Sequence, residues 1–265
     1  MRVVAIANQK GGVGKTTTCI NLAACLTALD QRVLLIDLDP QANATSGLGV
    51  AKAQGESLYE VLLGEARIAD CIRPTAYTDL HIIPSEVDLA GAEIDVARSD
   101  NYLHRVNDTL ADLKRDNPYD FVFIDCPPSL GILTMNAMAA ADGVLVPIQS
   151  EYYALEGLSV IVDLIEKIRR SGGNSRLRLE GIVMTMYDRR TNLSLQVAKE
   201  VRRHFAEHLF ETIIPRTVRL SEAPSHGLPI LDYDPEGAGA RAYTKLAEEF
   251  LARERSFASE APPAV

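Results

Sequence analysis

A glycine-rich stretch near the amino terminus constrains this chain more than any other feature. Residues 8–18 read Asn-Gln-Lys-Gly-Gly-Val-Gly-Lys-Thr-Thr-Thr, and they lie between an apolar run at 3–7 and a helical pattern at 19–29. A strand, a glycine-rich turn and a helix form the setting of a phosphate-binding loop. A glycine-rich hairpin without a ligand is disfavoured, because Gly-Lys-Thr lies at the junction between the strand and the helix.

The residue types in this stretch suit a bound phosphate. Gly11, Gly12 and Gly14 can adopt backbone angles that other residues avoid, so that N–H groups close around the anion. The positive end of the following helix adds to the attraction. Lys15 is expected to reach the outer phosphates, and the Thr16 hydroxyl to hold Mg²⁺.

The stretch departs from the usual pattern in one informative way. Gln9 stands where the pattern has its first glycine, and an additional lysine, Lys10, follows it. Lys10 is either a solvated loop lysine or a second positive charge beyond what one nucleotide site uses. The local sequence leaves both interpretations open.

Composition favours a globular, reduced protein. The length of 265 residues suits one large α/β domain, and no apolar run approaches the roughly 20 residues of a membrane span. The four cysteines are scattered, so that neither a metal site nor a disulfide framework is indicated. A reducing cytoplasm fits this cysteine usage best.

Short apolar runs alternate with helical patterns along the chain. After the run at 3–7, further strands are expected at 33–37, 80–84, 121–125, 144–148, 181–186 and 209–214. Helical patterns include 155–168, 193–205 and 243–255. This alternation predicts a doubly wound, mostly parallel α/β sheet flanked by helices. We expect a single domain over residues 1–255 and a frayed, Ala/Pro/Ser-rich tail over 256–265.

Carboxylates follow two of the predicted strands. Asp37 ends one strand and Asp39 lies two residues further on, so both side chains point to one side of an extended chain. One could orient the Mg²⁺ shell and the other an attacking water; alternatively, one of them only caps a turn. Asp125 ends another buried strand, where the metal of a phosphate loop usually finds its carboxylate, through water. Beside Lys15 and Thr16, this position becomes a strong candidate.

Charge is distributed unevenly. The net charge of −9 argues weakly against nucleic acid, but residues 165–219 contain twelve basic and six acidic side chains. This segment therefore carries +6 and the remainder −15. A basic zone on an acidic protein can still attract a phosphate backbone.

Taken together, these stretches resemble the ParA/MinD group of ATPases, which share a deviant Walker A loop with an additional lysine. More narrowly, the chain is similar to the ParA/Soj family of chromosome or plasmid partition ATPases. The loop alone identifies the superfamily. The narrower resemblance rests on Glu-Tyr-Tyr-Ala-Leu-Glu-Gly at 151–157 and Ser-Glu-Ala-Pro-Ser-His-Gly at 221–227.

The resemblance implies a role for each catalytic position. Lys10 would reach across a nucleotide-sandwich homodimer to the ATP of the partner, and Lys15 would bind phosphate in its own chain. Thr16 would ligate Mg²⁺, Asp125 would hold a water of the metal, and Asp39 would position the hydrolytic water.

The resemblance also implies the nucleotide contacts. The loop would surround the phosphates, and two later residues would border the adenine. The family often has asparagine at the second of these adenine positions, where this chain has threonine. The expected nucleotide-binding residues are Lys10, Gly11, Gly12, Val13, Gly14, Lys15, Thr16, Thr17, Pro215 and Thr217.

For DNA, the resemblance points to Arg190 and Arg219. Independently, an apolar stripe at 193, 197, 201 and 205 leaves Arg202 and Arg203 on the outer face of a helix, where they contact DNA or are simply solvated. We find no base-reading motif, so binding to double-stranded DNA is expected to be nonspecific.

The implied function is a segregation switch. ATP would join two protomers, the dimer would bind DNA in the cytoplasm at the nucleoid, and weak hydrolysis, stimulated by a ParB-type centromere-binding protein, would release it. A membrane ATPase is disfavoured because the last helical pattern, 243–255, is charge-balanced. An iron–sulfur carrier would need clustered cysteines. A small-molecule synthetase is disfavoured by the basic zone at 165–219 and by the partition-type stretches at 151–157 and 221–227.

Overall fold

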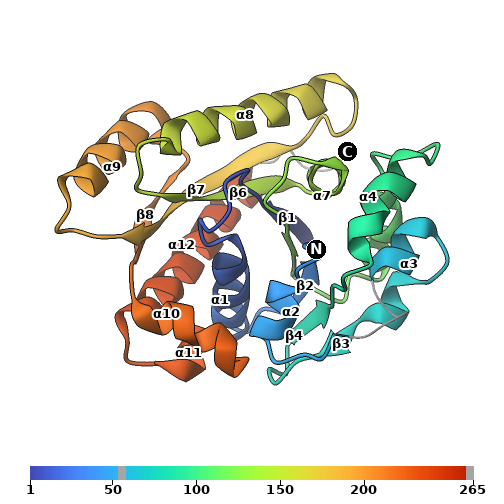
Figure 1. Ribbon diagram of the computed structural model, residues 1–265, viewed down its shortest axis with the longest axis horizontal. Helices are drawn as coiled ribbons and strands as arrows, with labels where there is room; N and C mark the ends of the chain where they lie inside the picture. Colours follow the sequence, from blue (N-terminus) through green and yellow to red (C-terminus); the bar gives the residue numbers. More distant parts are fainter. Residues whose placement is uncertain (53–57, 261–265) are drawn as a thin grey trace.

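The computed structural model describes residues 1–52 and 58–260 of the chain, which form one sheet with helices on both faces (Figure 1). The strand order is β3-β4-β2-β5-β1-β6-β7-β8, and every pairing is parallel except that of β3 with β4. The strands are β1 (Arg2–Ile6), β2 (Val33–Asp37), β3 (Arg73–Pro74), β4 (Leu80–Ile83), β5 (Phe121–Asp125), β6 (Gly143–Gln149), β7 (Arg178–Tyr187) and β8 (Leu209–Pro215).

Helices connect successive parallel strands of the sheet, because parallel strands need a crossover connection and cannot be joined by a tight turn. The helices are α1 (Lys15–Thr27), α2 (Asn43–Gly47), α3 (Leu58–Leu63), α4 (Leu89–Ala97), α5 (Arg105–Thr109), α6 (Ala111–Asp116), α7 (Ile132–Ala140), α8 (Ala154–Arg170), α9 (Asn192–Phe205), α10 (Val218–Glu222), α11 (Ile230–Tyr233) and α12 (Ala238–Glu260), with short 3₁₀ segments η1 (Ile68–Cys71) and η2 (Ala223–His226).

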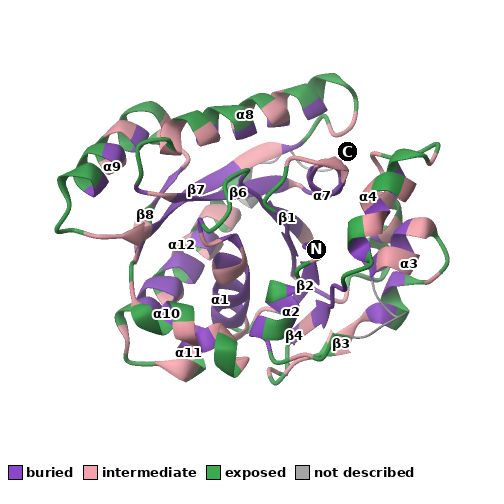
Figure 2. Cartoon of the chain, in the orientation of Figure 1, coloured by how far each residue is buried: buried purple, intermediate pink, exposed green. Residues whose placement is uncertain are grey.

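Each face of the sheet builds its own hydrophobic core. Along β1, Val3 and Ala5 belong to one core, whereas Val4 and Ile6 belong to the other. Alternate side chains of a strand point to opposite faces, which explains this division. The strands are accordingly buried almost throughout, while the outer surfaces of α8 and α9 are exposed (Figure 2).

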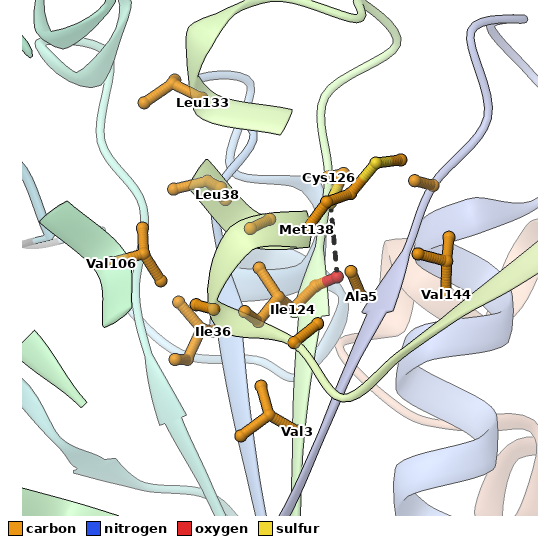
Figure 3. Close-up of a cluster of buried hydrophobic side chains, with 14 of the residues drawn as sticks. Val3, Ala5, Ile36, Leu38, Val106, Ile124, Cys126, Leu133, Met138 and Val144 are labelled. Atoms are coloured by element: carbon orange, nitrogen blue, oxygen red, sulfur yellow. Dashed lines mark hydrogen bonds between the residues drawn. The ribbon is translucent and has the colours of Figure 1, made fainter. Parts of the chain in front are cut away.

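Cys126 belongs to the first core. Its side chain lies near Met138 and Ala5, and its Sγ donates to the carbonyl of Ile124 at 3.7 Å (Figure 3). Burial raises the pKa of the Cys126 thiol above its usual range, since it disfavours the thiolate. Cys126 is therefore a small buried hydrophobic residue.

The predicted fold class is confirmed, and so is each predicted strand. The sequence did not indicate β3, because a two-residue strand that contains a proline has no periodicity to detect. The first helix begins at Lys15 rather than at residue 19, because the glycines end at Gly14. Among the described residues, no helix is long and apolar enough to cross a membrane.

The carboxyl-terminal boundary differs from the prediction. Helix α12 continues to Glu260, five residues past the expected domain end at 255. Residues 256–261 contain no proline, so the sequence has no helix-breaking residue just after position 255. The guanidinium of Arg178 also lies 3.7 Å from the centre of the Phe257 ring and anchors this turn. Residues 261–265 of the expected tail lie outside the described part.

Candidate nucleotide site

The glycine-rich loop lies at the carboxyl end of β1 and leads directly into α1. Gly12 and Gly14 have φ angles of +74° and +88°, which side chains with a Cβ rarely adopt. An added Cβ at Gly12 would meet no atom within 4 Å, so its backbone conformation, and not crowding, favours glycine. The loop thus leaves its inner face open to a ligand.

Two strands on the same side of β1, β6 and β7, hold the loop near its two ends. The Asn8 side-chain amide donates to the carbonyl of Pro147 in β6 at 2.8 Å. The Thr185 hydroxyl, from β7, donates to the carbonyl of Val13 at 2.7 Å. Both Asn8 and Thr185 are buried. The loop is therefore held in place before any ligand binds, as preorganised phosphate sites require.

The two lysines of the loop have different environments. Lys15 is buried, and its Nζ donates to the carbonyl of Lys10 at 3.1 Å. Burial lowers the pKa of Lys15, while the carboxylates of Asp125 and Asp39 oppose this shift. The Lys10 ammonium instead forms an exposed ion pair with Glu151, just after β6. Lys15 thus faces the site, whereas Lys10 lies at its rim.

Asp125 is the most unusual group in the site. It is fully buried, and neither of its carboxyl oxygens has a hydrogen-bond partner among the described residues. Burial raises the pKa of Asp125 well above its usual range, and the negative charge of Asp37, its neighbour across the sheet, acts in the same direction. The Thr16 hydroxyl, which lies near the carboxyl group but outside hydrogen-bonding geometry, and the Lys15 ammonium lower the pKa of Asp125 by a smaller amount.

An unpartnered buried carboxylate beside a threonine hydroxyl fits a Mg²⁺ site. Oxygen atoms are the ligands that Mg²⁺ prefers, and the ion commonly uses one or two protein oxygens together with phosphate oxygens and water. Among the described residues, no group of three or more His, Cys, Asp or Glu side chains could hold a metal alone. Thr16 and Asp125 therefore suit an ion that arrives with a nucleotide.

The structure distinguishes the two aspartates that follow β2. Both oxygens of Asp37 are occupied: Oδ2 accepts from the backbone N–H and the hydroxyl of Thr45, and Oδ1 accepts from the N–H of Asp39. Asp37 therefore caps the turn, one of the two possibilities that the sequence left open. In Asp39, Oδ1 accepts from the N–H of Gln41 at 3.0 Å, and Oδ2 has no partner among the described residues.

A cavity of about 950 Å³ adjoins the loop. Its lining combines Gly12, Gly14 and Thr17 with Pro215 and Thr217 from the segment after β8. The structure thus brings together the predicted phosphate and adenine positions. The Thr217 hydroxyl accepts from the N–H of Leu220 at 3.2 Å and so caps α10, which explains why a hydroxyl residue suits this position.

The four predicted DNA-binding arginines lie in two places. Arg190 follows β7 and Arg219 begins α10, so both lie near the carboxyl ends of adjacent strands. Arg202 and Arg203 lie in the last turn of α9, roughly 15 Å along the helix from its start at 1.5 Å per residue.

Three of these arginines have carboxylate partners in their own chain. Arg190 pairs with Asp188, Arg202 with Glu211 and Arg219 with Glu222. Hydrogen bonds from Arg190 lower the pKa of Asp188 to about 2. The excess positive charge of the basic zone is carried instead by cations without an ion pair in the described part of the chain: Lys167, Arg176, Arg189, Lys199, Arg203 and Arg216.

Sequence reasoning missed several contacts in the site. Glu151 stands in a stretch that carries the family resemblance, but its pairing with Lys10 joins residues 141 positions apart. The role of Thr45 was also missed, because a lone threonine after a strand carries no pattern. His226 stacks on Tyr233 with ring centres 4.9 Å apart, a packing role.

Comparisons with known proteins agree with this geometry. A family model described as an AAA domain matches residues 1–179. The chromosome partitioning protein ParA of Caulobacter vibrioides is 52% identical over 256 residues, which cover 96% of each chain. The chromosome-partitioning ATPase Soj of Thermus thermophilus is 51% identical over 253 residues, again 96% of each chain.

Solved structures show the same fold. A crystal structure of cobyrinic acid a,c-diamide synthase from Mycobacterium smegmatis, with a bound ATP analogue and magnesium, superposes with a TM-score of 0.83. It is 36% identical and covers 97% of each chain. That protein therefore holds a nucleotide and magnesium on the architecture described above.

Proposed function

Because the chain belongs to the ParA/Soj family of chromosome-partitioning ATPases, we propose that it is an ATP-dependent DNA-segregation switch. ATP and Mg²⁺ bind at the glycine-rich loop, and two protomers join over their nucleotides. The dimer binds double-stranded DNA without sequence preference, and hydrolysis, stimulated by a ParB-type centromere-binding protein, releases it. The observation that carries the proposal is the unpartnered buried carboxylate of Asp125 beside the loop of Lys15 and Thr16.

Each group has a chemical task in this proposal. The loop N–H groups and Lys15 bind the phosphates, while the Thr16 hydroxyl and Asp125 hold the metal and its water. When bound, Mg²⁺ neutralises the charge that develops on the phosphate oxygens. Asp39, whose Oδ2 accepts no hydrogen bond from the described residues, orients the attacking water.

Lys10 is the link between protomers in this proposal. Its side chain is 43% exposed and that of its partner Glu151 is 51% exposed. Exposed ion pairs contribute little to stability, so Lys10 can exchange Glu151 for the phosphates of a second protomer at small cost. The position of Lys10 at the rim of the site supports this role.

The dimer would present each basic surface twice. Affinity for DNA rises steeply with the number of phosphates neutralised, so that ATP-driven dimerisation would switch DNA binding on. Arg190 and Arg219 contribute from the nucleotide side of the sheet, and Arg202 and Arg203 from the end of α9. We accordingly place the protein in the cytoplasm, associated with the nucleoid.

Sedimentation velocity tests the dimer directly. With ATP and Mg²⁺, Asp39→Ala is expected to persist as a dimer, because it binds ATP but hydrolyses it slowly. Lys10→Ala is expected to bind ATP and remain a monomer. Arg115→Ala, which removes an exposed ion pair with Asp112 on α6, is the matched control and should behave as the wild type. A monomeric Asp39→Ala protein saturated with ATP would contradict the proposal.

A further inference from the structure

The segment that carries Asp39 is held at its amino-terminal end by Asp37. Asp39 N–H donates to Asp37 Oδ1 at 3.3 Å, which fixes the backbone of Asp39 itself. Ala42 follows with a φ of +55°, and its N–H donates to the Asp39 carbonyl at 2.8 Å. Residues 37–42 thus form a tight turn whose geometry depends on where the Asp37 carboxylate lies.

Thr45 in turn fixes that carboxylate. Its backbone N–H and its hydroxyl donate to Asp37 Oδ2 at 2.8 and 2.7 Å. The same hydroxyl oxygen accepts from the N–H of Ser85, just after β4, at 3.0 Å. Thr45 is fully buried, so these hydrogen bonds are shielded from water. Thr45 therefore joins the ends of β2 and β4 to the turn of Asp39.

The far side of α2 has a second anchor. Gly49, with a φ of +69°, approaches Gly227 so closely that an added Cβ at Gly227 would lie 2.7 Å from the Gly49 Cα. The end of α2 therefore packs directly against the backbone at the end of η2, which Gly227 terminates. The Asp39 turn is therefore followed by a helix that hydrogen-bonds through Thr45 and contacts η2 at its end.

We propose that Thr45 is a positioning residue for ATP hydrolysis, since its hydroxyl orients Asp37 and thereby holds Asp39 where it can act on water. This inference rests on the role of Asp39 in the proposed function. Thr45 itself touches neither nucleotide nor water in this account. Its effect on catalysis passes entirely through Asp39.

The test compares Thr45→Val, which keeps the shape but removes the hydroxyl, with Thr45→Ser, which retains it. Misplacement of a catalytic group by about 1 Å can cost roughly 100-fold in rate. We expect Thr45→Val to lower kcat roughly 10- to 100-fold with little change in the KM for ATP, and Thr45→Ser to restore most of it. Ser46→Ala is the matched control, because the Ser46 hydroxyl in the same helix donates only to the Ala42 carbonyl.

A double-mutant cycle separates positioning from general damage. In an Asp39→Ala background, Thr45→Val should lower the residual rate no further. An equal loss in both backgrounds, or a kcat for Thr45→Val within twofold of the wild type, overturns the inference. If Thr45→Val does not fold, Thr45→Cys replaces it, since a thiol is a weaker donor. Wild-type hydrolysis by Asp39→Ala alone would instead contradict the proposed function.

Discussion

The two ends of the central sheet treat buried carboxylates in opposite ways. At the amino end, Glu180 is fully buried and pairs with Arg2 and Arg178, each at 3.0 Å. At the carboxyl end, Asp125 is equally buried, but neither of its oxygens has a hydrogen-bond partner among the described residues. The same sheet thus carries an ion-paired carboxylate cluster at one end and a buried carboxyl group without a hydrogen-bond partner at the other.

This difference indicates what each end is for. An isolated buried charge destabilises a protein unless a counter-ion compensates it, whereas a paired one is tolerated. The pairs around Glu180, which also include Glu254, tie β1, β7 and α12 together. The lack of a hydrogen-bond partner at Asp125 suits a site that a cation completes. We therefore expect substitutions at the amino end to lower stability and substitutions at the carboxyl end to lower activity.

Asp125→Asn should have the largest effect, and it should fall on activity. Without the carboxylate, we expect ATP hydrolysis to fall by at least about 100-fold, since metal ions supply several kcal/mol of transition-state stabilisation. Thermal stability without nucleotide should stay the same or rise, because the amide removes a buried ionisable group that has no hydrogen-bond partner. Steady-state kinetics and calorimetry measure both. A clear fall in Tm would mean that Asp125 serves stability after all.

Glu180→Gln should show the reverse pattern. Removing one partner of a buried ion pair typically costs 3–5 kcal/mol, and here the remaining pairs with Glu254 favour the lower figure. A domain of this size loses roughly 2–4 °C in Tm for each kcal/mol, so we expect a fall of about 10 °C. The kcat per folded molecule should not change. A Tm within 2 °C of the wild type, in the same calorimeter, would remove the contrast between the two ends.

Two arginines at the carboxyl end should also affect function and not stability. Arg190 and Arg219, at the carboxyl end, form exposed pairs, so Arg190→Ala and Arg219→Ala should leave the Tm unchanged. Each should weaken DNA binding by the ATP-bound dimer and reduce the slope of log affinity against log salt by about 1. Retardation at several salt concentrations measures this, with Arg115→Ala as the control. Unaltered slopes in both variants would exclude them from the DNA surface.

The smallest expected effect concerns pH. Burial, together with the neighbouring Glu180, raises the pKa of Glu254 to about 7 from an ordinary value of about 4.5. The folded state therefore binds this proton more tightly than the unfolded state, and stability should fall as pH rises between these two values. Glu254→Gln should flatten that part of the curve. Denaturant melts at pH 5 and pH 8 check the sign, which would be opposite if Glu254 were stabilised as a carboxylate.

Local patterns were sufficient to predict most of the fold and to place the candidate phosphate and metal residues at strand ends. The glycine loop, Lys15, Thr16 and Asp125 lie at strand ends that apolar runs mark clearly, and parallel strands bring such ends together. Contacts between distant segments could not be predicted in this way. The Thr45 hydroxyl, which donates to Asp37, also accepts a hydrogen bond from the N–H of Ser85, 40 positions further along the chain. No periodic pattern in the sequence predicts that contact.

The arginines illustrate the same limit. Spacing placed Arg202 and Arg203 on the outer face of a helix, and they are exposed there. It gave no indication that Glu211 from β8 pairs with Arg202 while Arg203 remains unpaired among the described residues. Arg202 and Glu211 are only nine positions apart, but the turn between α9 and β8 that brings them together carries no periodic pattern.

DNA retardation by the Asp39→Ala protein tests the central claim most directly. The claim is that ATP bound at the carboxyl end of the sheet causes two protomers to dimerise, and that this dimer binds DNA. With ATP and Mg²⁺, Asp39→Ala should retard DNA of any sequence persistently, whereas with ADP it should not. Equal retardation with ATP and ADP, or none with either at low salt, would contradict the account.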